Sequence, residues 1–185
     1  TAASSLTDTP NTPTARLILR RGKEESLRRF HPWIFSGAIY RMEGSPAEGD
    51  LVDLFTSQGE FIARGHYQIG SITVRVLSFA DEAIDQAWWN QRIEQAYRMR
   101  QALGLTDNPQ TTCYRLVHGE GDSLPGLVID IYGPTAVVQC HSVGMYRSRK
   151  AICTALKSVY GPKICSIFDK SGGTLPYNAG LNAQD

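Results

Sequence analysis

The sequence predicts an α+β protein in which a small β-barrel is followed by a connecting helix and a small mixed α/β domain. The first half carries short β-rich segments with Gly and Ser at their joints, which is typical of a small barrel. A helical pattern of apolar residues begins near residue 85, and the second half then alternates strands with one further helix. With 185 residues, of which 42% are hydrophobic, the chain can form the cores of two small units.

The first unit is expected at residues 15–80. Residues 1–14 are rich in Thr, Ser, Pro and Ala, and we expect a disordered tail because so little apolar surface cannot offset the entropy of ordering. A strand is predicted at 16–20, a short helix at 23–30, and further strands between residues 50 and 79. Pro32 restricts His31 to extended geometry, so the helix should end there.

The connecting helix is expected at residues 81–105. Asp81 or Asp85 can cap its start, and Gly104 lies where a C-terminal cap belongs. Residues with helical spacing should form its buried face: Ile84, Trp88 or Trp89, Ile93, Ala96, Tyr97 and Leu103.

The second unit is expected at residues 106–180, followed by the start of a linker at 181–185. Its predicted order is strand, strand, strand, helix, strand. The helix covers about 145–160 and ends at Gly161-Pro162, since glycine supplies a left-handed cap and proline cannot continue a helix.

Charge is concentrated near the N-terminus although the formal net charge is only +1. Residues 16–41 carry seven basic and two acidic side chains, a local balance of +5. Such a cluster indicates a surface for a polyanion such as RNA, or a merely solvated face. Trp33 and Phe35 are expected to fill the barrel. The predicted phosphate contacts are therefore the basic residues, which are seldom buried: Arg20, Arg21, Lys23, Arg28 and Arg29.

A second basic cluster, Arg147, Arg149 and Lys150, lies near the start of the later helix. Positive charge at a helix N-terminus opposes the macrodipole, so the dipole does not explain it. An anionic partner and an ordinary solvated helix end are both open.

The stretch RLVHGEGDSLPGLVIDIYG, residues 115–133, places His118, Glu120 and Asp122 at alternate positions. In an extended strand this trio could hold a metal or move a proton, which would suggest a metal-dependent hydrolase. Gly119 and Gly121 instead favour a bend that separates the side chains, so we expect a structural loop and no metal. It is also no dinucleotide-binding loop, because a strand follows where a helix is required.

The remaining sequence signals are mostly negative. Cys113, Cys140, Cys153 and Cys165 form no CxxC pair, and we expect reduced, buried thiols in a cytoplasmic protein. No segment has the pattern of a signal peptide or the length of a membrane span, and no catalytic motif is present.

Several motifs resemble a known family. FHPWIFSGAI, GDLVDLFTSQGEFIARGHY and SITVRVLS look like the PUA domain that opens a family of S-adenosylmethionine-dependent 23S rRNA (cytosine-C5) methyltransferases. RLVHGEGDSLPGLVIDIYG resembles the hallmark of the small domain that follows it there. The family pattern usually has Gly at the position of Ser123, and often a charged residue at that of Ile131.

The resemblance implies ribosomal RNA as partner and S-adenosylmethionine as cofactor of the complete enzyme. It places the methyl donor and the catalytic cysteine in a Rossmann-like domain absent from this chain, so we expect the chain alone to bind no cofactor and to lack catalytic residues. A free-standing PUA-type RNA-binding module is the alternative, and the oligomeric state is open.

Overall fold

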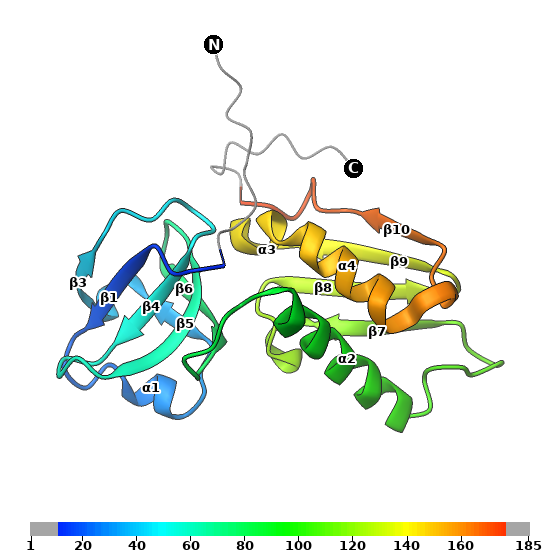
Figure 1. Ribbon diagram of the computed structural model, residues 1–185, viewed down its shortest axis with the longest axis horizontal. Helices are drawn as coiled ribbons and strands as arrows, with labels where there is room; N and C mark the ends of the chain where they lie inside the picture. Colours follow the sequence, from blue (N-terminus) through cyan, green and yellow to red (C-terminus); the bar gives the residue numbers. More distant parts are fainter. Residues whose placement is uncertain (1–10, 177–185) are drawn as a thin grey trace, which may run out of the picture.

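A computed structural model describes residues 11–176, which form two packed units (Figure 1). The first unit is a curled sheet of six strands in the order β2-β6-β5-β4-β1-β3. The β1–β4 pair is parallel and the other pairs are antiparallel. Its elements are β1 (Ala15–Leu19), α1 (Glu25–Arg28), β2 (Trp33–Phe35), a 3₁₀ turn (Ser36–Ala38), β3 (Ile39–Glu43), β4 (Leu51–Phe55), β5 (Phe61–Tyr67) and β6 (Ile72–Ser78).

Strand alternation builds the core of the curled sheet. In β1, Ala15, Leu17 and Leu19 are buried, whereas Arg16 is exposed and Ile18 is half-buried, as the period of two requires. Leu27 of α1 closes the core at one end and is 1% exposed. Arg16 therefore faces outward, because the residues on either side of it in β1 face inward.

The helix predicted at 23–30 is shorter than expected. It forms a single turn, Glu25–Arg28, and ends where Phe30 takes a left-handed φ of 60°. The amide of Phe30 donates to the carbonyl of Leu27, and that of His31 to Ser26, at 2.8 and 3.0 Å. This paired pattern is a Schellman motif, and it ends the helix before Pro32 can act.

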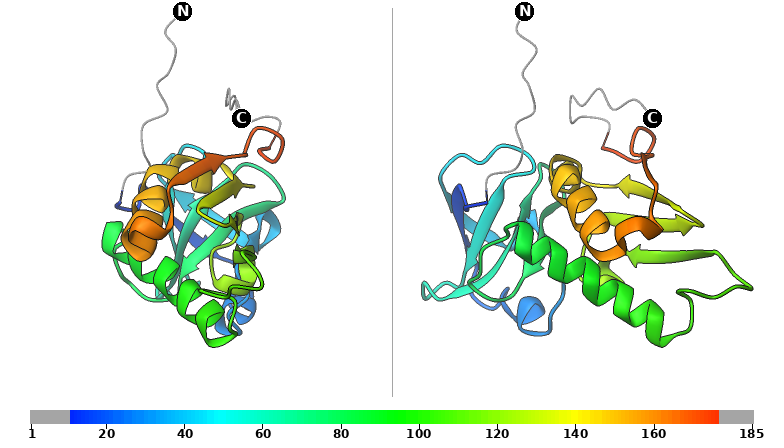
Figure 2. Two further views of the ribbon diagram at one scale, coloured as in Figure 1. Left: turned by 90° about the vertical axis from the view of Figure 1, so that its right-hand side faces the viewer. Right: turned by 45° about the vertical axis from the view of Figure 1, so that its right-hand side comes forward.

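The second unit is a four-stranded sheet in the order β10-β9-β8-β7, with β9 and β10 parallel. Helices α2 and α4 lie side by side over one of its faces (Figures 1 and 2). Its elements are α2 (Gln86–Ala102), β7 (Cys113–His118), the 3₁₀ turn η2 (Gly119–Asp122), β8 (Leu127–Tyr132), β9 (Thr135–Cys140), α3 (Val143–Arg147), α4 (Arg149–Tyr160), a 3₁₀ turn (Gly161–Lys163) and β10 (Ser166–Asp169).

The ends of the helices decide one open choice and correct two expectations. Asp85, not Asp81, caps α2, since its carboxylate accepts from the amide of Trp88 at 2.9 Å. The helix predicted at about 145–160 is broken at Ser148 into α3 and α4. Leu103, which was expected on the buried face, is 67% exposed because α2 ends one residue earlier.

The two units share an apolar core. Leu51 of β4 and Leu77 of β6 belong to the hydrophobic cluster of the second unit, together with Trp88, Trp89 and the inner face of the four-stranded sheet. Polar contacts reinforce the junction, because the amide of Val143 donates to Gln68 Oε1 at 3.3 Å. The barrel therefore completes the core of its neighbour.

Candidate functional site

The five predicted contact residues lie on one continuous segment that surrounds α1. Arg20 follows β1, Arg21 and Lys23 lie in the turn before α1, and Arg28 and Arg29 end the helix. All five are exposed. Arg28 lies 3.8 Å from Glu60, and both side chains are more than half exposed, so that pair is weak.

The other four side chains of this group, Arg20, Arg21, Lys23 and Arg29, make no hydrogen bond or ion pair within residues 11–176. We call the five residues the α1 basic patch. By contrast, Arg16 lies over the Phe55 ring at 4.1 Å, and Arg41 is paired with Glu43 at 2.6 Å. The local charge of +5 therefore divides into a patch available to an anion and two arginines that already have partners.

Aromatic side chains beside the patch are more exposed than the sequence indicated. Only Ile34 of β2 points into the barrel, because a three-residue strand has room for one inward side chain. Trp33 is half-buried and Phe35 is 48% exposed, so the expectation that both fill the barrel is wrong. Phe30 and Tyr40 are also exposed, at 72% and 67%. Flat apolar rings next to cations can stack on unpaired bases.

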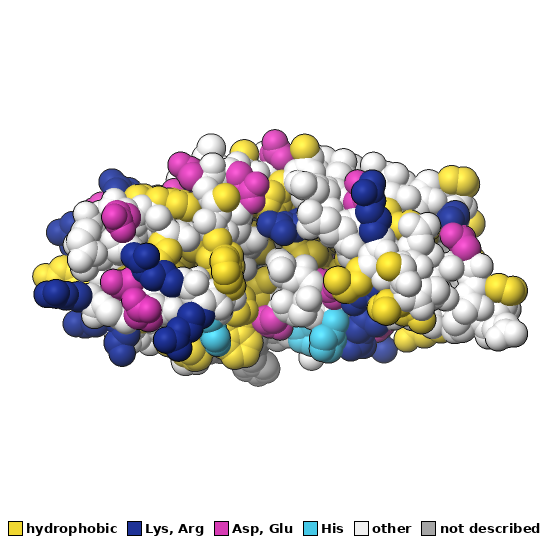
Figure 3. Space-filling view, turned by 90° about the horizontal axis from the view of Figure 1, so that it is seen from below, with side chains coloured by type: hydrophobic (Ala, Val, Ile, Leu, Met, Phe, Trp, Pro, Cys, Tyr) yellow, Lys and Arg dark blue, Asp and Glu magenta, His cyan; other side chains and the backbone are white. Residues whose placement is uncertain are grey.

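Figure 3 shows the molecule from the side on which α1 lies. Lys and Arg side chains gather over the barrel, with a few acidic groups among them, and the surface is hollowed where the two units meet. Basic charge and exposed hydrophobic surface therefore occur together on this face.

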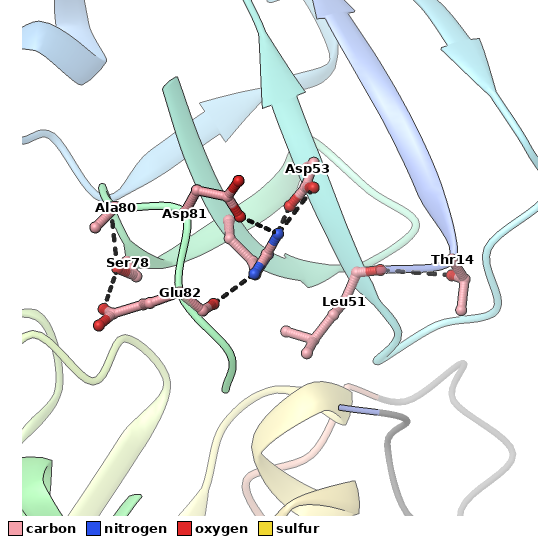
Figure 4. Close-up of polar contacts among 8 residues, drawn as sticks. Thr14, Leu51, Asp53, Ser78, Ala80, Asp81 and Glu82 are labelled. Atoms are coloured by element: carbon pink, nitrogen blue, oxygen red, sulfur yellow. Dashed lines mark hydrogen bonds and ion pairs between the residues drawn. The ribbon is translucent and has the colours of Figure 1, made fainter. Parts of the chain in front are cut away.

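Arg64 fixes the barrel to the segment that leads into α2. Its guanidinium donates to both oxygens of Asp53, at 2.7 and 3.0 Å, and to Asp81 at 2.9 Å. It also donates to the carbonyl of Glu82, and these partners converge in Figure 4. The side-chain bonds to Asp53, followed by the charges of both aspartates, raise the pKa of Arg64. These bonds attach the segment before α2 to the barrel strands β4 and β5.

Within the second basic cluster, Arg147 has a structural role. Arg147 is 8% exposed and donates to Asp50 Oδ1 at 2.7 Å and to the carbonyl of Glu48 at 2.8 Å. Arg149 lies over the Tyr146 ring at 4.0 Å. The junction with the barrel thus explains Arg147, and an anionic partner is not needed. No local sequence pattern indicates the Arg147–Asp50 pair, because the two residues are 97 positions apart.

His118, Glu120 and Asp122 diverge, as the glycines predicted. Asp122 pairs with Arg100 and accepts from the amide of His118 at 2.6 Å. Glu120 turns toward the barrel, where its carboxylate accepts from Trp33 Nε1 at 2.9 Å. The three side chains therefore cannot share a metal, and the described residues contain no group of three or more metal ligands. This geometry removes the basis for a metal-dependent hydrolase.

The same turn does not fit S-adenosylmethionine. Gly119, Glu120 and Gly121 form a short 3₁₀ turn that leads into β8, so no helix N-terminus faces the loop. Gly119 has a φ of 49°, but Gly121 does not take a positive φ. The left-handed residue after the turn is Ser123, with a φ of 58°. The loop is therefore a scaffold turn.

The cysteines are all free thiols. Cys140 is buried, and burial raises its pKa to about 12. Cys153 is partly buried, but Cys113 and Cys165 are exposed, so the expectation of four buried thiols is wrong for these two. Both lie at or beside the start of an outer strand, β7 and β10 respectively, where half of the side chains face solvent. No helix of the described chain is long and apolar enough to cross a bilayer.

Comparison with known proteins identifies a domain profile and several relatives. Residues 17–79 match the profile of the PUA-like domain. The chain is 43% identical over 170 residues to proteins named ribosomal RNA large subunit methyltransferase I, from Shigella flexneri and from Escherichia coli K12. The match covers 91% of this chain but 42% of each relative, so the chain spans about two fifths of the length of these proteins.

Two solved structures share the fold. One, described as a SAM-dependent methyltransferase from Streptococcus mutans, has a TM-score of 0.71 and 19% identity, over 84% of this chain and 40% of that one. The other, described as a methyltransferase complexed with SAH, has a TM-score of 0.73 and 20% identity, over 92% and 43%. The first unit of the chain is therefore a PUA-like domain, and the chain as a whole is homologous to ribosomal RNA large subunit methyltransferases.

Proposed function

We propose that this chain is the RNA-binding part of an S-adenosylmethionine-dependent methyltransferase that acts on ribosomal RNA in the cytoplasm. The observation that carries the proposal is the α1 basic patch, because four of its five side chains make no hydrogen bond or ion pair within the described residues, and the patch lies in a PUA-like domain. An unpaired guanidinium or ammonium group at the surface can neutralise phosphate and release condensed counterions.

The reaction we propose for the whole enzyme is methyl transfer to C5 of a cytosine in 23S rRNA. In this scheme the described residues supply affinity and placement, while methyl donor and catalytic cysteine belong to another part of the enzyme. The η2 turn supports this division, since it leads into β8 and offers no helix N-terminus to a cofactor.

Salt dependence of RNA binding tests the role of the patch. Binding of this chain to a structured 23S rRNA fragment should weaken steeply with added salt. Replacing Arg20, Arg21 or Arg29 by Ala should lower the slope of log affinity against log salt by roughly one unit or somewhat less each. Arg98, which is exposed on α2 and paired with Glu94, is the matched control.

A salt slope that no patch substitution changes would show that the patch is only a solvated surface. The reaction itself is tested with the full-length protein, S-adenosylmethionine carrying a labelled methyl group, and 23S rRNA. Label on a base other than cytosine would contradict the C5 assignment and leave RNA binding standing.

A further inference from the structure

A pocket of about 260 Å³ opens where the two units meet. The barrel contributes Trp33 of β2 and Arg75 of β6, while the second unit contributes η2 and the beginning of β8. The residues of the second unit that line it are His118, Gly119, Glu120, Gly126, Leu127, Val128 and His141. The pocket is separate from the α1 basic patch, whose residues do not line it.

Arg75 is unlike the other arginines that are buried in the protein. Arg64, Arg100 and Arg147 each donate to a carboxylate. Nη1 of Arg75 is buried and has no hydrogen-bond partner in the described residues. Burial lowers the pKa of Arg75, and the charge of Glu120 opposes this without a hydrogen bond. A buried donor without an acceptor is costly, so an acceptor from outside would be favoured there.

Trp33 lies directly opposite Arg75 in the antiparallel β2–β6 pair, so both side chains are on the same face of the sheet. The indole is held by its hydrogen bond to Glu120, 2.9 Å long, which comes from the facing unit. Leu127 and Val128 line the pocket as well, and His118 and His141 are exposed. The pocket thus combines an oriented aromatic ring, apolar surface and one unsatisfied donor.

Size and chemistry limit the occupant. Pockets for drug-sized ligands measure about 300–1,000 Å³, so this one suits a single planar ring system better than a whole cofactor. Arginine only donates, and every nucleobase carries acceptors on its edge. We propose that the junction pocket receives one unpaired base of the bound RNA, which contacts Trp33 and accepts from the guanidinium of Arg75. This inference rests on the proposed RNA-binding function.

The Trp33 indole resonance reports directly on the pocket. The chain has three tryptophans, and Trp88 and Trp89 are only 4% and 3% exposed in the core, so their indole signals are internal controls. Single-stranded oligoribonucleotides should shift the Trp33 indole N–H signal in proton–nitrogen correlation spectra. Inorganic phosphate, or an oligomer in which every nucleotide is abasic, should leave it in place.

Two variants change the pocket in opposite directions. Arg75→Gln should weaken binding of the oligoribonucleotides roughly tenfold, while Arg98→Gln on exposed α2 should not. Glu120→Gln keeps an acceptor for Trp33 but removes the competing negative charge beside Arg75, so it should strengthen binding severalfold. Because Glu120 is exposed, this variant keeps the test decisive even if Arg75→Gln fails to fold.

The outcomes separate the two proposals. If RNA binds with a patch-dependent salt slope but the Trp33 signal does not move, the pocket proposal is overturned and the proposed function stands. An equal shift of the Trp33 signal with inorganic phosphate would show an anion site and would overturn the role of the base. Unchanged affinity for the oligoribonucleotides in Glu120→Gln would also overturn the pocket proposal. If no RNA binds at all, both proposals fail.

Discussion

Ser123 occupies a backbone conformation that favours glycine. Ser123 follows η2, is exposed, and has a φ of 58°. The methyltransferase family that the sequence resembles usually has Gly at this position. A left-handed conformation costs an L-residue roughly 1–2 kcal/mol. Ser123→Gly should therefore stabilise the protein by about 0.5–1 kcal/mol in urea unfolding, after the entropic cost of glycine. Ser158→Gly, at an exposed position inside α4, is the control and should lower the free energy of unfolding instead.

Glycines around the same loop differ sharply in what they tolerate. Gly126 has a φ of 87°, and a Cβ there would lie 2.8 Å from Oγ of Ser142, which caps α3. Gly126→Ala should destabilise by about 2 kcal/mol or more, since strain and a lost cap combine. A Cβ added at Gly121 would have no neighbouring atom closer than 3.8 Å, so Gly121→Ala should change the free energy of unfolding by no more than about 0.5 kcal/mol. Equal urea midpoints for the two variants would contradict this reasoning.

The arginines show what a single sequence reveals at the residue scale. That Arg20, Arg21 and Arg29 are exposed follows from the cost of burying a guanidinium, and it was predicted. Arg147 and Arg75 are exceptions whose environment depends on residues far away in the chain. Side-chain chemistry predicts the usual location of a residue, whereas its exceptions are set by tertiary contacts.

At the scale of elements, Asp85 decides where α2 begins. Its carboxylate satisfies the amide of Trp88, one of the free N–H groups of the first turn. Asp85→Ala should lower the unfolding free energy by about 1 kcal/mol in denaturant melts. Asp81→Ala removes a 73% exposed partner of Arg64, which keeps Asp53, and should cost less. The reverse order of the two losses would disprove the assignment of the cap.

Strands and helices were predictable to different degrees. The alternation in β1 and β6 and the helical spacing of α2 are local patterns, and the structure has these elements. The early end of α1 depends on Phe30 adopting a left-handed conformation that glycine usually fills, so composition gave no signal. The break at Ser148 coincides with contacts that α3 makes to the barrel, through Val143 and Arg147. Long-range packing thus shapes the ends of elements more than their existence.

At the scale of the whole molecule, one part of the candidate site could be predicted from the sequence and the other could not. The α1 basic patch is continuous in sequence, so charge counting was sufficient to propose it. The junction pocket joins Trp33 and Arg75 to residues 118–128 and His141, which come together only when the two units pack. No local motif could have revealed it, and Trp33 was assigned to the barrel interior instead.

His66 makes the junction sensitive to acid. It is 2% exposed and lies against Gly144 of the second unit, and burial, then the charges of Arg147 and Arg75, lower its pKa from 6.5 to about 3, opposed by Asp50. Between these values the unfolded chain binds a proton that the folded chain does not. Stability should therefore fall as pH drops from 6.5 toward 3, by at most about 1.4 kcal/mol per pH unit from this group.

The variant His66→Gln isolates that contribution. It cannot take up a proton, so its unfolding free energy should decline less between pH 7 and pH 5 than that of the unaltered protein. Urea melts of both proteins at the two pH values give the comparison, and carboxylate titrations cancel because they occur in both. Identical pH dependence would show that folding does not lower the pKa of His66.

Leu51 and Leu77 lie in the core of the second unit although they belong to barrel strands. Neither unit can lose its structure without exposing apolar surface of the other, so we expect cooperative unfolding in a single transition. Tryptophan fluorescence from Trp88 and Trp89 and amide exchange in β1 should give the same midpoint. A ligand held only by the barrel then protects α2, β7 and β8 from unfolding as well, by mass action on the one equilibrium that they share.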